Sequence, residues 1–145
     1  MNNKHLPFMY KIAPRDIRLK VLAGLMDTDG SLGNGTFEIA QKSDTITNDI
    51  LFLARSCGFA AYSVKCEKGC WYKGEYRKGI YNRTTISGHV SDIPTLIPRK
   101  QAGPRKQIKN VLHTGAKIEY IGINDYYGFT TDGNGRFLLD DFTVI

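Results

Sequence analysis

The sequence predicts an α+β fold, in which amphipathic helices alternate with short strands and a β-rich tail follows. Three observations support this class. A chain of 145 residues with 41% hydrophobic and 23% charged residues has the composition of one compact globular domain, or of one domain with a short appendage. Apolar residues recur at helical spacing in two segments. Between and after these segments, apolar and polar residues alternate in short stretches bounded by glycine.

The first long helix is expected to begin near Pro14, after a lead-in without clear periodicity. Proline suits the first position of a helix, because its missing N–H has no partner there in any case. Ile17, Val21 and Leu25 recur at four-residue intervals and define one apolar face. Gly30 is expected to end the helix, because glycine readily takes the left-handed conformation found at helix ends.

A strand over residues 35–42 is expected next, preceded by a turn around Asn34. Ser43 suits the cap of a second helix, which Gly58 would end. Two further strands are predicted over residues 60–68 and 79–87.

The segment between those two strands, residues 69–78, is expected to form a long hairpin tip. A short proline-bearing stretch over residues 92–97 follows. After it we expect a basic turn and a helix that reaches His113.

From residue 117 onward the pattern changes to short strands, predicted over residues 117–123, 126–131, 136–139 and 142–145. Residues 132–135, Asp-Gly-Asn-Gly, suit a tight hairpin turn. The predicted organisation is a lead-in over residues 1–13, a main domain over residues 14–115 and a β-rich tail over residues 116–145.

Several classes of protein are excluded at this stage. No apolar run approaches the roughly 20 residues needed to cross a bilayer, so no membrane partner is expected. The first residues lack the apolar core of a signal peptide. Three cysteines cannot all pair within the chain, which favours a reducing compartment, the cytoplasm or the nucleus. Cys66 and Cys70 do not combine with Cys57, His89 and His113 into a recognisable zinc spacing.

Positive charge is concentrated in the middle of the chain. The whole chain carries a formal charge of +6, whereas residues 65–109 hold eleven basic residues against three acidic ones, a surplus of eight. Such a local surplus suits a polyanion, with double-stranded DNA the expected partner. The alternative is a solvated basic face without a partner.

Aromatic residues alternate with these cations. Basic groups in such a pattern can bind phosphates while the rings pack over sugars or base edges. The same pattern also suits a two-stranded ribbon whose rings cover the core. The candidate DNA-binding residues are Lys65, Lys68, Trp71, Lys73, Arg77, Lys78, Tyr81, Arg83, Arg99, Arg105 and Lys106.

The most informative segment is residues 22–30, Leu-Ala-Gly-Leu-Met-Asp-Thr-Asp-Gly. Ala23 and Gly24 are small, so a second helix can approach closely there. Asp29 lies at the end of the helix, where the helix dipole makes a carboxylate unfavourable by roughly 0.3–1 kcal/mol. A hard divalent cation such as Mg²⁺ would relieve this, since it favours carboxylates together with phosphate oxygens.

This segment resembles the LAGLIDADG signature of homing endonucleases, with seven of nine residues identical. The resemblance implies an αββαββα saddle whose β-ribbons lie in successive major grooves of DNA. It implies that Asp29 and the backbone carbonyl of Thr28 bind Mg²⁺, while Asp27 bonds locally. A basic residue beside the cleaved phosphate assists catalysis in the family. Lys100 is the candidate here, with Lys106 second.

Two other interpretations of the segment stay open. Residues 27–38 match part of a calcium loop, with Glu38 at the twelfth position. Leu32 stands at the sixth position, where that loop needs glycine. The segment also suits an ordinary amphipathic helix with an acidic end and no metal.

The chain holds one copy of the motif, whereas an active unit of this family needs two such helices. The second helix would come from a homodimer partner or from a missing N-terminal half.

The tail also resembles a known pattern. Tyr-Tyr-Gly at residues 126–128 and Phe-Leu-Leu at residues 137–139 resemble the C-terminal block of inteins, which normally ends in His-Asn. An ordinary β-meander is the alternative. Together the resemblances imply an intein-derived DNA endonuclease that makes double-strand breaks during intein homing, followed by the last strands of a Hint-like splicing domain. The alternatives are a splicing fragment with a degenerate endonuclease, and a DNA-binding module that does not cleave.

Overall fold

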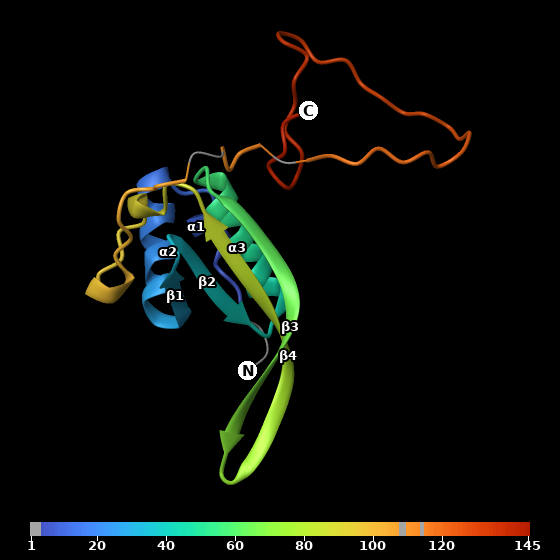
Figure 1. Ribbon diagram of the computed structural model, residues 1–145. Coiled ribbons are helices and arrows are strands. Elements are labelled where there is room, and N and C mark those ends of the chain that lie inside the picture. Colours follow the sequence, from blue (N-terminus) through green and yellow to red (C-terminus); the bar gives the residue numbers. More distant parts are fainter. Residues whose placement is uncertain (1–3, 108–109, 114) are drawn as a thin grey trace. The chain divides into compact units, whose positions relative to one another are not determined.

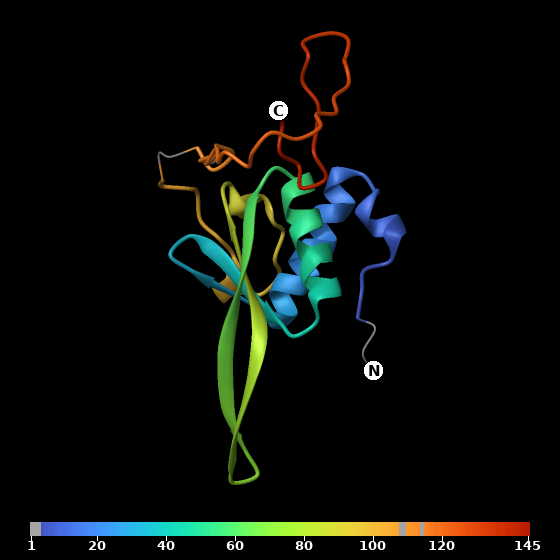
Figure 2. The ribbon, with the colours of Figure 1, turned by 90° about the vertical axis from the view of Figure 1, so that its right-hand side faces the viewer.

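The computed structural model describes residues 4–107, 110–113 and 115–145. The chain divides into two compact units, Met1–Leu112 and His113–Ile145. In the first unit, helices cover one side of a four-stranded antiparallel sheet (Figures 1 and 2), so the α+β class is confirmed. No helix in the described part of the chain has both the length and the apolar character needed to span a bilayer.

The predicted long helices are both present, as α2 and α3. The lead-in, predicted to lack periodic structure, contains one short helix, α1. The elements in chain order are α1 (Phe8–Lys11), α2 (Arg15–Asp29), β1 (Gly30–Gly33), β2 (Thr36–Gln41), α3 (Asp44–Ser56), β3 (Ala60–Tyr72), β4 (Glu75–Ser87), and the 3₁₀ helices η1 (Val90–Asp92) and η2 (Pro98–Lys100).

The sheet has the strand order β1-β2-β4-β3, so β1 and β3 form its edges. Every second residue of a strand faces the helices. Phe37 of β2 pairs with Ile86 of β4, which in turn pairs with Ala61 of β3, and all three are buried. Leu22 and Met26 of α2 join them in the core. Burial of this row fixes which side of each strand faces solvent.

The core-facing side of α2 differs from the prediction. Leu19, Leu22, Ala23 and Met26 are buried, whereas the predicted face of Ile17, Val21 and Leu25 is only half-buried. Apolar residues lie on two opposite faces of this helix, and periodicity alone does not say which face packs on the sheet. The helix therefore retains a second apolar face, which the described residues cover only in part.

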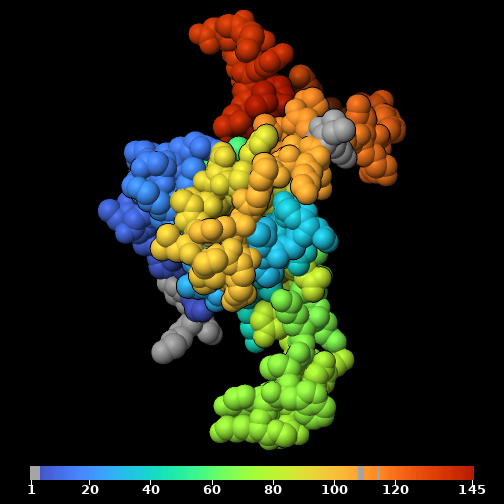
Figure 3. Space-filling model, turned by 60° about the vertical axis from the view of Figure 1, so that its left-hand side comes forward, coloured from blue at the N-terminus to red at the C-terminus, as the bar shows by residue number. Residues whose placement is uncertain are grey.

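Two-residue turns close both hairpins of the sheet. Asn34 and Gly35 have positive φ, 51° and 72°, and so do Lys73 and Gly74, with 51° and 82°. This is the type I′ geometry that matches the twist of antiparallel strands. The predicted long tip over residues 69–78 is therefore wrong, because the ladder continues to Tyr72 and Glu75. The β3–β4 ribbon stands clear of the packed body of its unit (Figure 3).

Gly30 ends α2 as predicted, but for a different reason. Its backbone is extended, with φ −83° and ψ 165°, and is not left-handed. A Cβ atom at this position would lie 2.8 Å from the Cα atom of Met26. Glycine is required here because the chain turns directly from helix to strand against its own last turn.

The segment after β4 contains only the two 3₁₀ helices. The predicted helix reaching His113 is wrong for the described residues 101–107 and 110–113, which hold neither helix nor strand. Gly103 and Pro104 interrupt this stretch, and proline disfavours helical backbone at the preceding residue.

The second unit was predicted to contain four strands. Its pairing in the described residues is confined to the segments 137–139 and 143–145, around a Leu138–Val144 bridge. The predicted strands over residues 117–123 and 126–131 are wrong in this structure, and the 132–135 turn joins no paired strands. Ile118, Ile123 and Tyr126 are more than nine-tenths exposed. A strand needs a buried face to fix its register, and the described residues of this unit include no fully buried side chain.

Candidate metal and nucleic-acid site

The carboxyl end of α2 presents Asp29 at the surface. One oxygen of its carboxylate, Oδ2, accepts a hydrogen bond of 2.9 Å from Nε2 of Gln41. The β1–β2 hairpin brings the two together, because its register pairs Gly30 with Ile39 and so returns the end of β2 to the end of the helix. Gln41 was not among the predicted site residues. Its place beside Asp29 follows from topology, because β1 and β2 form a hairpin directly after the helix.

Asp29 fits one place in the coordination shell of Mg²⁺. It offers a hard oxygen ligand, and Mg²⁺ in proteins usually takes one or two carboxylates while waters and phosphates complete the shell. The described residues contain no group of three or more His, Cys, Asp and Glu side chains that would hold a metal alone. The Thr28 hydroxyl donates to the carbonyls of Gly24 and Leu25 in its own helix, at 3.0 and 3.2 Å. Its carbonyl remains the group predicted to bind the ion.

Asp27 was predicted to bond locally, but its carboxylate bonds to a distant segment of the chain. Its carboxylate accepts hydrogen bonds from the backbone N–H groups of Leu96 and Ile97, at 2.8 and 3.2 Å. These partners lie 69 and 70 residues further along the chain. The first acid of the motif thus holds the segment that precedes η2.

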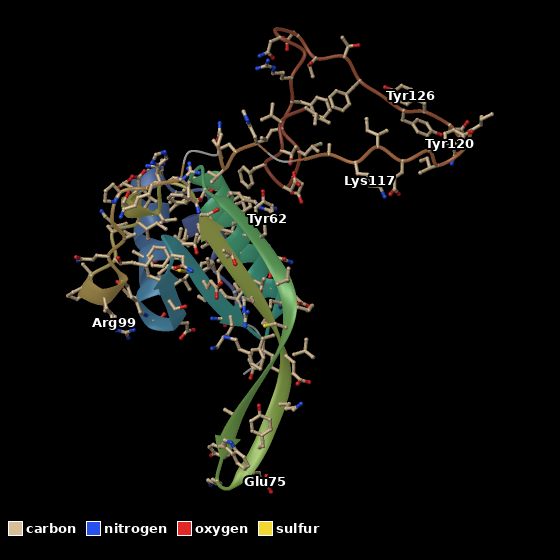
Figure 4. All side chains as sticks on the ribbon, viewed as in Figure 1. Tyr62, Glu75, Arg99, Lys117, Tyr120 and Tyr126 are labelled. Atoms are coloured by element: carbon tan, nitrogen blue, oxygen red, sulfur yellow. The ribbon has the colours of Figure 1, made fainter. Side chains whose placement is uncertain are left out.

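Lys100, the predicted catalytic lysine, lies at the same end of α2. Its side chain is buried, and Nζ donates to the carbonyls of Met26 and Asp27, both at 2.8 Å. Carbonyls in the last turn of a helix lack intrahelical donors, and a cation also complements the negative end of the dipole. No ion pair joins Lys100 to Asp29 within the described ranges. The neighbouring Arg99 is exposed and projects from η2 (Figure 4).

Ala23 and Gly24, the two residues predicted to form a helix–helix interface, lie on different sides of α2. Ala23 is buried in the core of its own unit, so it does not face a second helix. Gly24 is exposed, and a Cβ atom there would have nothing within 4 Å. Together with Ile17, Val21 and Thr28 it forms a surface row along α2, here called the open stripe, on the side opposite the core.

The candidate DNA-binding residues of the ribbon are divided between its two faces. The outer face, on the side of the sheet that the helices do not cover, carries Lys68, Arg77, Tyr81 and Arg83. The inner face carries Lys65, Trp71 and Lys78. Lys73 occupies the turn. The division follows from the strict alternation of side chains along each strand.

The outer face contains a shallow pocket of about 440 Å³, here called the basic groove. The residues that line it are Lys42, Lys68, Gly69, Cys70, Tyr72, Arg77, Lys78, Gly79 and Tyr81. The guanidinium of Arg77 lies 4.9 Å from the centre of the Tyr72 ring, a cation–π distance. Within the described residues, neither Lys68 nor Arg83 forms an ion pair. These cations are therefore available to an anion.

The inner face is neutralised within the chain. Lys65 pairs with Asp44 at 2.6 Å and Lys78 pairs with Glu67 at 2.8 Å. Hydrogen bonds from Lys65 and then Asn82 hold the pKa of Asp44 below its ordinary value. Trp71 packs on Tyr76, with ring centres 5.4 Å apart. The cations of the inner face are therefore less available to DNA than those of the outer face.

The remaining candidates follow the sheet. Arg99 lies in η2, Arg105 is half-buried and Lys106 is exposed.

Comparison of the chain with models of protein families and with curated proteins finds no match. The functional conclusion therefore depends on the geometry of the chain itself.

Replacing Lys100 with Met is expected to lower the free energy of unfolding by about 1–3 kcal/mol, because the Asp27 carbonyl loses the Lys100 donor and the Met26 carbonyl keeps only the N–H group of Gly30. Arg99→Met is the matched control. It removes the same charge one residue away from an exposed position, and its effect should stay within about 0.5 kcal/mol. Urea denaturation measures both values. Equal stability losses in the two variants would contradict the capping role of Lys100.

Proposed function

We propose that this chain is one half of an intein-derived, Mg²⁺-dependent, sequence-specific DNA endonuclease of the LAGLIDADG type. One observation carries the proposal. Asp29, the exposed acid that ends α2, accepts a hydrogen bond from Gln41, and the residue after Gln41, Lys42, lines the basic groove. A metal-binding carboxylate is thus joined through two consecutive residues to a surface suited to phosphates.

Each group has a distinct part in the proposed reaction. A bound Mg²⁺ ion would activate a water molecule and stabilise the leaving oxygen of the phosphodiester. Asp29 binds that ion, and Gln41 fixes the orientation of the carboxylate. Lys100 contributes positive charge from the end of α2, and Arg99 offers an exposed guanidinium for a phosphate oxygen. The basic groove holds the duplex through its backbone and presents Tyr72 and Tyr81 to it.

The open stripe on α2 supports the need for a second helix. Ile17 and Val21 remain half-buried, and the exposed Gly24 allows another backbone to approach closely. A second copy of this helix would bring a second Asp29 to the same place. The partner is either another copy of this chain or an N-terminal half carrying its own motif.

Asp29→Asn should abolish cleavage while leaving binding to duplex DNA largely intact, because the variant loses a metal ligand and keeps every cation of the basic groove. The measurement is cleavage of a random-library duplex pool with Mg²⁺, alongside a binding assay on the same pool. Asp16→Asn, which removes an exposed carboxylate at the other end of α2, is the control and should cleave normally. Unchanged cleavage by the Asp29 variant would refute the assignment. Absence of cleavage by the wild-type chain together with DNA binding would favour a module that only binds.

The two faces of the ribbon should differ in their contribution to binding. In the double variant Lys68→Gln/Arg83→Gln, two unpaired cations of the outer face are lost, and the slope of log affinity against log salt should fall by about 2. The control is Lys65→Gln, which removes one paired cation of the inner face that does not line the basic groove, and it should change the slope by much less than the value of about 1 expected for each phosphate contact. Salt titrations of duplex binding measure both. A change of about 1 in the control would show that both faces contact phosphate.

A second candidate function, participation in protein splicing, is favoured by two observations on the second unit. Phe129 of the Tyr-Tyr-Gly-Phe segment contacts Phe137 of the Phe-Leu-Leu segment, with ring centres 4.6 Å apart. Apolar and aromatic side chains elsewhere in this unit, including Tyr120 and Tyr126, project from extended backbone into solvent (Figure 4). A segment of this kind suits one part of a domain whose other part covers these side chains.

The residues that follow Ile145 in the gene test this second candidate. A splicing role requires His-Asn at that point, followed by Cys, Ser or Thr. Sequencing past the last codon decides the question, and the absence of His-Asn or a similar pair would exclude splicing without affecting the endonuclease proposal.

A further inference from the structure

A group of hydrogen bonds joins α2 to the segment of residues 95–100. Asp27 contacts that segment through both its side chain and its backbone. Its carboxylate accepts the N–H groups of Leu96 and Ile97, and its carbonyl accepts from Nζ of Lys100 at 2.8 Å. Lys100 also donates to the carbonyl of Met26. We call these four hydrogen bonds the clasp.

We propose that Asp27 is a positioning residue, which holds Arg99 and Lys100 at a fixed place beside Asp29 through the clasp. The inference rests on the proposed endonuclease function. It assigns the two acids of the motif to different tasks: Asp29 binds the metal, and Asp27 sets where the basic segment lies.

The side chains of the segment explain why the backbone bonds matter. Leu96 is 84% exposed, so its side chain does not anchor the segment. The backbone N–H group of Leu96, which donates to Asp27, anchors the segment instead. Thr95 is buried, and its hydroxyl donates to the carbonyl of Lys100 at 2.8 Å. The segment is therefore closed on itself, and a displacement at Leu96 would move Arg99 and Lys100 together.

The chemistry of the clasp is specific for aspartate. A carboxylate accepts through both oxygens, and here each oxygen receives one N–H group. Asparagine offers one acceptor and would place its amide donor against the other N–H. An acid near the end of a helix is disfavoured by the dipole. The two N–H groups and the Lys100 ammonium compensate for it, so the position is occupied by a charge that has partners.

Asp27→Ala and Asp27→Asn test the inference in the full chain, and Asp49→Asn is the matched control. Asp49 in α3 makes the same kind of clamp, accepting the N–H group of Leu6 at 2.7 Å and Nζ of Lys11 at 2.6 Å, with neither partner in the proposed site. Two readouts are needed: hydrogen exchange of the Leu96 and Ile97 amides, and kcat and KM with Mg²⁺ on a duplex selected by the wild-type chain.

We expect Asp27→Ala to accelerate exchange at Leu96 and Ile97 and to lower kcat by about 10- to 100-fold, the usual effect of losing a residue that orients the groups of a metal site. KM for the duplex should change much less than kcat, because the basic groove keeps its cations and only the Arg99 contact is displaced. Asp27→Asn, which keeps one acceptor, should lie between Asp27→Ala and the wild type. Asp49→Asn should lose stability while keeping kcat, which separates positioning from general destabilisation.

The outcomes distinguish the two proposals. A wild-type chain that cuts while Asp27→Ala retains kcat, or loses kcat no more than Asp49→Asn does, overturns the inference and leaves the endonuclease function standing. Unchanged exchange at Leu96 and Ile97 in Asp27→Ala also overturns it. A wild-type chain that forms a dimer on duplex DNA and still cuts none overturns the endonuclease function and, with it, the positioning role.

Discussion

The carboxyl end of α2 is the point on which the rest of the first unit depends. A helix leaves its last carbonyls without partners, and this helix also ends in two acids. The chain satisfies these groups from two directions. The β1–β2 hairpin returns Gln41 to Asp29, and the segment after the sheet brings backbone N–H groups and the Lys100 ammonium to the last turn. Groups distant in sequence are thereby gathered at the end of this helix.

Alternation along the ribbon supplies the second constraint. Because neighbouring residues of a strand point to opposite sides, a cluster of cations in sequence becomes two surfaces of different character. Lys65 and Lys78 are used within the chain, where they pair with Asp44 and Glu67. Lys68 and Arg83 remain for a partner. The charge surplus counted along the sequence therefore overstates the positive charge of the inner face, where Lys65 and Lys78 are neutralised within the chain.

The α+β class, the two long helices and the acid at the end of α2 could be predicted from the sequence, because each depends on local periodicity or on a short motif. The apolar face that packs on the sheet could not, since α2 has two such faces and only tertiary packing chooses between them. Gln41 and the partners of Asp27 could not either. They depend on hydrogen bonds between residues far apart in the chain, which spacing does not encode. The expected strands of the tail failed because alternation had no buried face to act on.

The long outer strand of the sheet has a consequence for the behaviour of the protein in solution. β3 is thirteen residues long and forms one edge of the sheet, so the backbone groups that point away from β4 offer a surface on which another extended chain could add and begin aggregation. The side chains along it oppose this. Arg55 of α3 covers the Ala61 carbonyl with two hydrogen bonds of 3.0 and 2.9 Å, and Lys65, Glu67 and Lys68 place charges further along the strand. Some of the charged residues of this chain thus serve colloidal stability, whatever their part in recognition.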